Sequence, residues 1–267
     1  MAYIDSLPTE LLLKIASYGC SSQKMYLSLV LVSKRYYAVA KYYGLRNTPI
    51  RISSHSLRSF YEFVTTHGMG KYVGYLWINS TSALCSQAVK ACTNLVCLAC
   101  SKVVLYSLCA PLPTDHDGFQ HTKLTELTIF DNWESWHTLQ QPSHIYALQL
   151  FRQITHLRLH GFISSFLQVD MFPALTHYSC SYQNADLMAD QVASVASLPR
   201  LQSIAITTYY WKNEPMDART ESLLLMDKRI KFVFLGPNEL GEFTLWCGRA
   251  RKTACFWTVE AKPRKVL

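Results

Sequence analysis

Residues 124–130 read LTELTIF, and residues 154–160 read ITHLRLH. In both stretches an apolar residue is followed by a second one three positions later and by a third one two positions after that. The same spacing occurs seven times, at Val73–Leu76–Ile78, Leu95–Leu98–Cys100, Leu124–Leu127–Ile129, Ile154–Leu157–Leu159, Leu175–Tyr178–Cys180, Leu201–Ile204–Ile206 and Ile230–Val233–Leu235. Successive side chains of a β-strand point to opposite faces, so the last two residues of each triplet share one face. The pattern predicts seven strands, each buried on that face.

Helices are predicted between several of these strands. The triplets start 21 to 30 residues apart, which leaves room for a return segment. Residues 57–66, 86–94 and 185–197 read as short helices, the first from apolar residues at helical spacing. A period of about 20–29 residues with this apolar spacing is typical of leucine-rich repeats, and residues 46–245 resemble an irregular array of them. The resemblance implies an α/β fold, a solenoid of about seven β-α units with a curved parallel sheet.

Residues 6–42 predict three short helices. Pro8 suits a first helical turn because its ring fixes φ and its missing N–H is not needed there. Glu10 in the same turn favours the positive end of the helix dipole, and Ser33 is a good N-cap for the third helix. Helices this short are marginal alone, so they need either the following domain or a partner protein.

The two ends of this helical segment carry a specific pattern. It opens with Leu7-Pro8 and Glu10, and residues 32–37 end it with VSKRYY. This pattern resembles the F-box motif, and the resemblance implies that residues 1–45 form a three-helix module that docks on the Skp1 linker protein of a cullin-RING ubiquitin ligase. The implied docking residues are Leu7, Pro8, Leu11, Leu12, Ile15, Leu29, Val32, Lys34 and Arg35. The alternative is a helical cap that covers the first repeat.

A target protein is expected on the strand positions that alternate with the buried ones, and on the loops that follow them. Aromatic side chains and Arg are the usual anchors of protein interfaces. The residues singled out on this basis are Trp77, Phe130, Trp133, Trp136, His156, Arg158, Tyr210 and Trp211. The last strand would add Phe232 and Phe234. The alternative is that the loop aromatics fold over the repeat edges as core.

The C-terminal segment, residues 246–267, is basic. The chain has 26 Lys and Arg against 18 Asp and Glu, a net charge of +8. We interpret the segment as a solvated tail. Within it, residues 254–259 could form a last strand, or the segment could act as a cap. Nucleic acid is a disfavoured partner, because the basic charge is not accompanied by a nucleic-acid-binding motif.

Catalytic and metal-binding motifs are not evident. Cys92, Cys97, Cys100 and Cys109 could supply four thiolates, but Cys97 and Cys100 would point to opposite faces of one strand. Nine cysteines without a secretory signal favour free, buried thiols. His156, His160 and His177 lack a nearby acidic partner in the sequence. We therefore expect no metal, no cofactor and no enzymatic activity.

These observations together are similar to the fungal-type group of F-box proteins with leucine-rich repeats. They imply a substrate-recognition adaptor of an SCF-type ligase, with Skp1 and the cullin complex on one side and a target protein on the other. The sequence predicts no membrane span and no secretory signal, so a cytoplasmic or nuclear location and a monomer before assembly are expected. The alternative is a repeat scaffold without a ligase partner.

Overall fold

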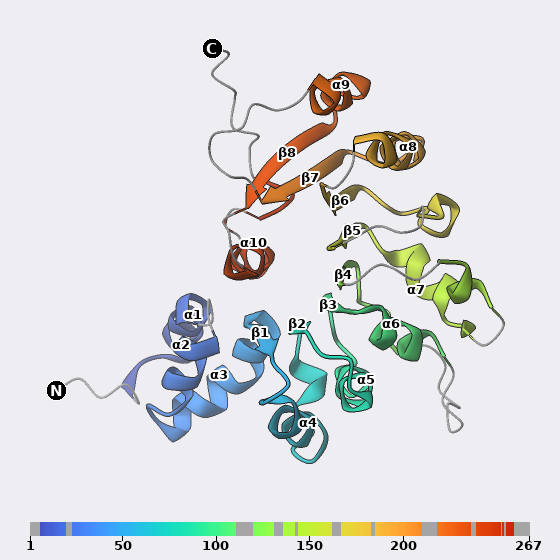
Figure 1. The fold of residues 1–267 in the computed structure, drawn as a ribbon. Coiled ribbons are helices and arrows are strands. Elements are labelled where there is room, and N and C mark those ends of the chain that lie inside the picture. Colours follow the sequence, from blue (N-terminus) through green and yellow to red (C-terminus); the bar gives the residue numbers. More distant parts are fainter. Residues whose placement is uncertain are drawn as a thin grey trace, which may run out of the picture. The chain divides into compact units, whose positions relative to one another are not determined.

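The computed structural model describes residues 6–19, 23–110, 120–130, 136–141, 144–161, 167–182, 185–209, 218–235, 239–251, 253 and 255–258. The chain divides into two compact units, residues 1–124 and residues 125–267. In each unit the strands pair in parallel with their neighbours in the chain. Helices alternate with the strands (Figure 1). The α/β class and the parallel sheet are therefore confirmed.

The first unit begins with three helices, α1 (Thr9–Gly19), α2 (Gln23–Val30) and α3 (Lys34–Asn47). Ser33 caps α3 as predicted, since its Oγ accepts a hydrogen bond of 3.0 Å from the backbone N–H of Tyr36. The side chains buried among these helices are Leu12, Ala16, Tyr26, Tyr36 and Ala40. The helices therefore pack against one another through a small apolar core.

The rest of the first unit alternates strands with helices. The strands are β1 (Pro49–Ile52), β2 (Tyr75–Ile78) and β3 (Cys97–Ser101). The helices are α4 (Leu57–Thr65), α5 (Ala83–Lys90) and α6 (Lys102–Cys109), with a short 3-10 helix, η2 (Gly70–Tyr72). Strand β1 was not predicted, whereas β2 and β3 lie on the first two triplets. Leu76, Ile78, Leu98 and Cys100 are fully buried, as expected for the last two positions of each triplet.

The three N-terminal helices join the sheet without a break. The predicted boundary after residue 45 lies inside α3, and α2 contacts β1 through Gln23, whose Oε1 accepts from the backbone N–H of Arg51 at 3.2 Å. The backbone at Gly74 also lies against α3, because a Cβ at this position would lie only 2.3 Å from the Arg46 carbonyl oxygen. The helices and the first strands therefore form one packed unit.

The second unit contains β4 (Glu126–Phe130), β5 (His156–Leu159), β6 (His177–Ser181), β7 (Ser203–Tyr209) and β8 (Ile230–Leu235). Its helices are α7 (Ala147–Gln153), α8 (Ala185–Ala196), α9 (Ala218–Met226) and α10 (Glu239–Arg251), with the 3-10 helices η3 (Trp136–Gln140) and η5 (Val169–Met171). Figure 1 shows α7, α8 and α9 on one side of these strands and α10 on the other. The sheet of this unit is thus covered on both faces.

The register of β8 differs from the predicted one. Ile204 pairs with Ile230 and Ile206 pairs with Phe232, while Thr207 pairs with Val233. Residues paired in register in a parallel sheet point to the same face. Phe232 therefore lies on the face of Ile206, and Lys231 and Val233 lie on the opposite face with Thr207. The prediction that Phe232 belongs to the open face was wrong by one residue.

The C-terminal segment also differs from the prediction. Residues 246–251 are the end of α10, so the predicted boundary before residue 246 falls inside a helix. Residues 255–258 form a turn, with the Thr258 N–H donating to the Cys255 carbonyl at 3.1 Å, and not a strand. Among the described helices, none has the length and apolar character needed to span a membrane.

Candidate partner-binding surfaces

One face of α1 is apolar and exposed. Leu11 and Ile15 are 48% and 37% exposed, and Tyr18 is 72% exposed. Their spacing of four and then three residues places them on one side of the helix. Leu12 and Ala16, on the other side, are fully buried. The helix therefore has two apolar faces, one packed into the module and one open to solvent.

The residues implied by the F-box resemblance divide between these environments. Pro8, Leu11, Ile15, Val32 and Lys34 are exposed, Leu7, Leu29 and Arg35 are half-buried, and Leu12 is buried. Further large apolar side chains of the same helices are exposed although the resemblance implied no docking role for them, namely Tyr18, Met25, Leu27, Leu31, Tyr37 and Tyr43. Apolar exposure of this extent commonly marks an interaction surface.

A second feature lies on the face of the β4–β8 sheet that α10 covers. Arg158 of β5 is fully buried there. Its Nη1 donates to Ser179 Oγ at 2.8 Å, and both Nη atoms donate to Thr207 Oγ1 at 3.1 Å. The guanidinium carbon lies 4.2 Å from the centroid of the Phe256 ring. Two hydroxyls and an aromatic face thus hold the cation on the sheet.

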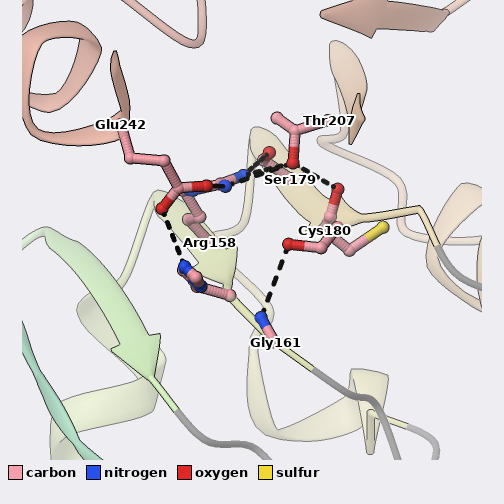
Figure 2. Close-up of polar contacts among 8 residues, drawn as sticks. Arg158, Gly161, Ser179, Cys180, Thr207 and Glu242 are labelled. Carbon is pink, nitrogen blue, oxygen red and sulfur yellow. Dashed lines mark hydrogen bonds and ion pairs between the residues drawn. The ribbon is translucent and has the colours of Figure 1, made fainter. Parts of the chain in front are cut away.

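Helix α10 supplies the counter-charge. Arg158 Nη2 donates to Glu242 Oε1 (Figure 2). The other carboxylate oxygen of Glu242 lies 3.2 Å from His160 Nε2. Glu242 is 1% exposed, so both members of the ion pair are out of water. Removing a charge from water is costly unless a partner compensates it, which makes each residue depend on the other.

A second ion pair holds the other end of α10. Arg249 Nε donates to Glu126 Oε1 of β4 at 2.6 Å. Burial raises the pKa of Glu126 above its ordinary value, and the guanidinium of Arg249 acts in the opposite direction. Arg249 therefore helps to keep this buried carboxylate charged.

His156 and His177 stack on neighbouring strands beside this helix. Their ring centroids are 4.3 Å apart with an interplanar angle of 6°, and the edge of Trp257 lies against both. The Nδ1 atoms lie 2.9 Å from the hydroxyls of Thr155 and Thr176, respectively. The hydroxyl of Thr155 donates to the Thr125 carbonyl and that of Thr176 donates to the Thr155 carbonyl, so each hydroxyl accepts from the imidazole. We infer that Nδ1 carries a proton in both rings.

The surroundings of the two rings oppose their protonation. Burial lowers the pKa of His156 to about 3, and the neighbouring His177 and Arg249 act in the same direction. Burial also lowers the pKa of His177, with contributions from Lys231 and Arg249. Lys231 is close because its Nζ donates to the Trp257 carbonyl at 2.7 Å.

We expect the melting temperature to fall as the pH is lowered from about 6.5, the usual pKa of an unfolded His, towards 3. In this window the unfolded chain binds more protons than the folded one, so stability is lost with acid. His156→Leu should reduce the loss of unfolding free energy by roughly 1 kcal/mol per pH unit in this window. The melting temperature, measured by circular dichroism, should then fall less steeply with acid. His67→Leu, at an exposed position, is the control; equal slopes for both variants would contradict the assignment.

The residues singled out as a target site are mostly buried. Trp77, Phe130, Trp136, His156 and Arg158 are each less than a tenth exposed. Trp136 packs edge-on against Phe151 and Phe172, and so lies in the apolar core. Trp133, Tyr210 and Trp211 lie outside the described residues. The expected exposure is thus not found for the described members, and their contact with a target stays a prediction.

Three residues important to this face were missed. Glu242, Phe256 and Trp257 cover Arg158 and His156. Phe256 and Trp257 stand in the segment interpreted as a basic tail or end cap, and Glu242 stands at the end of the segment assigned to the repeats. Two acidic residues close together, Glu239 and Glu242, could have signalled a helix that carries a counter-charge. No sequence spacing connects them to strand β5.

The described cysteines are buried free thiols. Burial raises the pKa of Cys92, Cys100, Cys109 and Cys180, which keeps these side chains neutral. Within the described ranges, no three His, Cys, Asp or Glu residues gather in a way that could hold a metal ion.

We compared the chain with models of protein families, with curated proteins and with solved structures, and none of these comparisons gave a match.

Proposed function

We propose that this chain is a substrate-recognition adaptor of an SCF-type cullin-RING ubiquitin ligase. The observation that carries the proposal is the exposed apolar stripe of Leu11, Ile15 and Tyr18 on α1, inside a sequence that resembles the F-box motif. The helices α1–α3 would dock on Skp1, and the irregular leucine-rich-repeat-like strands and helices would bind the target. The cullin complex would supply the catalysis.

The division of the motif residues into buried and exposed side chains supports docking over a purely capping role. A cap turns its apolar residues towards the repeat that it covers. Here Leu12 and Ala16 already serve the internal packing, and Leu11, Ile15 and Val32 remain in contact with solvent. The apolar area of the latter three residues is available for a partner.

The role that we assign to the protein is positioning. Binding of Skp1 by one part and of a target by the other raises the effective concentration of the target near the ligase. No enzymatic step, cofactor or metal enters this proposal. It places the protein in the cytoplasm, the nucleus or both, as a monomer before assembly, without a membrane or nucleic-acid partner.

The test is the affinity of the full-length chain for Skp1 from the same organism, measured by titration calorimetry. The double variant Leu11→Asp/Ile15→Asp should bind at least 100-fold more weakly, because two carboxylates would lose hydration on docking. Both positions are exposed, so the variant is expected to fold. A deletion of residues 1–44 is less suitable, since it would cut α3 and uncover β1.

The matched control is Leu148→Asp/Leu225→Asp, which places the same charges on exposed positions of α7 and α9. This control should bind Skp1 like the original chain. Unchanged binding by the α1 double variant, or no binding by the folded original chain, would refute the docking assignment.

The alternative function is a repeat scaffold in which α1–α3 act only as a cap. The hydrogen bond from Arg51 to Gln23 and the close approach of Gly74 to Arg46 favour it, because they show α2 and α3 packed on the first strands. In that case the folded original chain would not bind Skp1, and Leu11→Asp/Ile15→Asp would change neither the fold nor any binding. Titration calorimetry of the original chain with Skp1 therefore distinguishes the two functions.

A further inference from the structure

We propose that the face of the β4–β8 sheet under α10 is the target-binding surface, that α10 occupies it as an internal substitute for the target, and that the target is a helix with a carboxylate and a basic group seven positions apart. This inference rests on the proposed adaptor function only for what happens to the bound target. The binding surface itself is argued from contacts within the second unit.

The sheet face offers two complementary charges to an incoming helix. Arg158, held by Ser179 and Thr207, presents a guanidinium that takes a carboxylate. Glu126 on the neighbouring strand presents a carboxylate that takes a basic group. Arg and carboxylate pairs of this kind fix the register and direction of a helix more than they add affinity.

Helix α10 matches these charges with two residues. Glu242 binds Arg158, and Arg249 binds Glu126. They are seven positions apart, which is about two helical turns or 10 Å along the axis, and so they lie on one side of the helix. A target helix with the same spacing and direction would reproduce both pairs.

The turn after α10 completes the occupied surface. Phe256 stacks against the Arg158 guanidinium, and Trp257 covers His156 and His177. The surface therefore also accepts aromatic side chains beyond the charged helix. Arg and aromatic groups are the anchors that protein interfaces use most.

The contacts of α10 with the sheet differ from those of the helices on the opposite face. Helices α7 and α8 bury Leu150, Phe151, Val192 and Val195, which are apolar. Helix α10 also buries Trp246 and Cys247, but in addition it meets the strands through two ion pairs. The buried pair of Arg158 and Glu242 gives little net stability compared with apolar packing, because desolvation offsets the attraction. A partner helix that supplies both charges can therefore take the place of α10, while the apolar residues under α7 and α8 stay packed.

The experiment uses a fluorescent peptide of residues 239–258 and the full-length chain. The variant Glu242→Arg/Arg249→Glu reverses the charges of α10 and leaves the sheet face unchanged. We expect the peptide to bind this variant at least 10-fold more tightly than the original chain, whose own α10 competes. A peptide with both reversals should not bind. The control chain Arg152→Glu/Asp190→Arg, reversed on exposed helix positions, should behave like the original.

A folded variant that does not bind the peptide would overturn the proposal. If the variant does not fold, hydrogen exchange of the original chain decides. Amides of residues 241–251 should be at least 10-fold less protected than those of β5–β7, as local release of α10 requires. Equal protection would make α10 a permanent part of the fold and would overturn the proposal. Skp1 affinity is measured separately with the α1 variants. A negative result for the α10 surface therefore does not affect the test of Skp1 docking, and the reverse also holds.

Discussion

Replacing Arg158 with Met should lower the free energy of unfolding by about 3–5 kcal/mol. The substitution keeps most of the side-chain volume but leaves the carboxylate of Glu242 buried beside His160 without its guanidinium. Ser179 and Thr207 would also lose a shared donor. Urea denaturation, followed by tryptophan fluorescence, measures the change.

The double variant Arg158→Met/Glu242→Leu separates the pair from the packing. It should recover more than half of the lost stability, because it removes the uncompensated charge together with its partner. Arg152→Met, at an exposed position of α7, is the matched single control and should change stability by less than about 0.5 kcal/mol. A loss below about 1 kcal/mol for Arg158→Met would show that Glu242 finds compensation elsewhere.

Leu12→Asp should unfold the helices α1–α3, in contrast to the neighbouring Leu11→Asp. Leu12 is fully buried, whereas Leu11 is 48% exposed. Loss of the buried leucine costs about 2–5 kcal/mol, and an unpaired carboxylate in its place adds to that cost. Circular dichroism at 222 nm would report the loss of helix, and binding of Skp1 would fall as a consequence.

The two variants together decide why binding is lost. Leu11→Asp should weaken Skp1 binding with a normal helix signal, and Leu12→Asp should weaken it with a reduced signal. Equal helix signals for both would mean that the two faces of α1 are not distinguished as described. The pair has the same chemistry one residue apart, so neither residue type nor added charge explains a difference.

Seven of the eight described strands were predictable because each contains the apolar triplet. In this triplet one apolar residue is followed, three and five positions later, by two apolar residues that share a face of the strand. Strand β1 lacks the first residue of the triplet. Ile50 and Ile52 alternate correctly, but the position three before Ile50 is Asn47, the last residue of α3. The end of a helix occupies the place where the other repeats have an apolar lead residue, so the pattern could not include β1.

The register of β8 was missed for a similar reason. The position three before Ile230 is Asp227, so the triplet rule selects Ile230, Val233 and Leu235 instead. Asp227 is not apolar because it binds the side chain and backbone N–H of Arg229 at 2.6–3.1 Å. A polar turn contact takes the place of the apolar lead residue. The triplet spacing therefore assigns the buried face of β8 to residues that are shifted by one position.

The sheet face was found from the sequence, but its occupant was not. Phe130, His156 and Arg158 do alternate with the buried positions of β4 and β5, as predicted. His156 and Arg158 are covered by α10 and the turn after it, which stand more than 80 residues later in the chain. Periodicity describes which face of an element is apolar, and it contains no information on which distant segment covers a polar face.

The ion pairs of α10 also set an order of assembly. Neighbouring strands join residues that are close in the chain, as Thr125 and Thr155 are at a separation of 30 residues, whereas Arg249 meets Glu126 across 123 residues. Local contacts form quickly and long-range closures slowly. During synthesis, Arg158 can meet Glu242 only after 84 further residues have been added. A nascent chain therefore presents this sheet face open before the finished protein covers it.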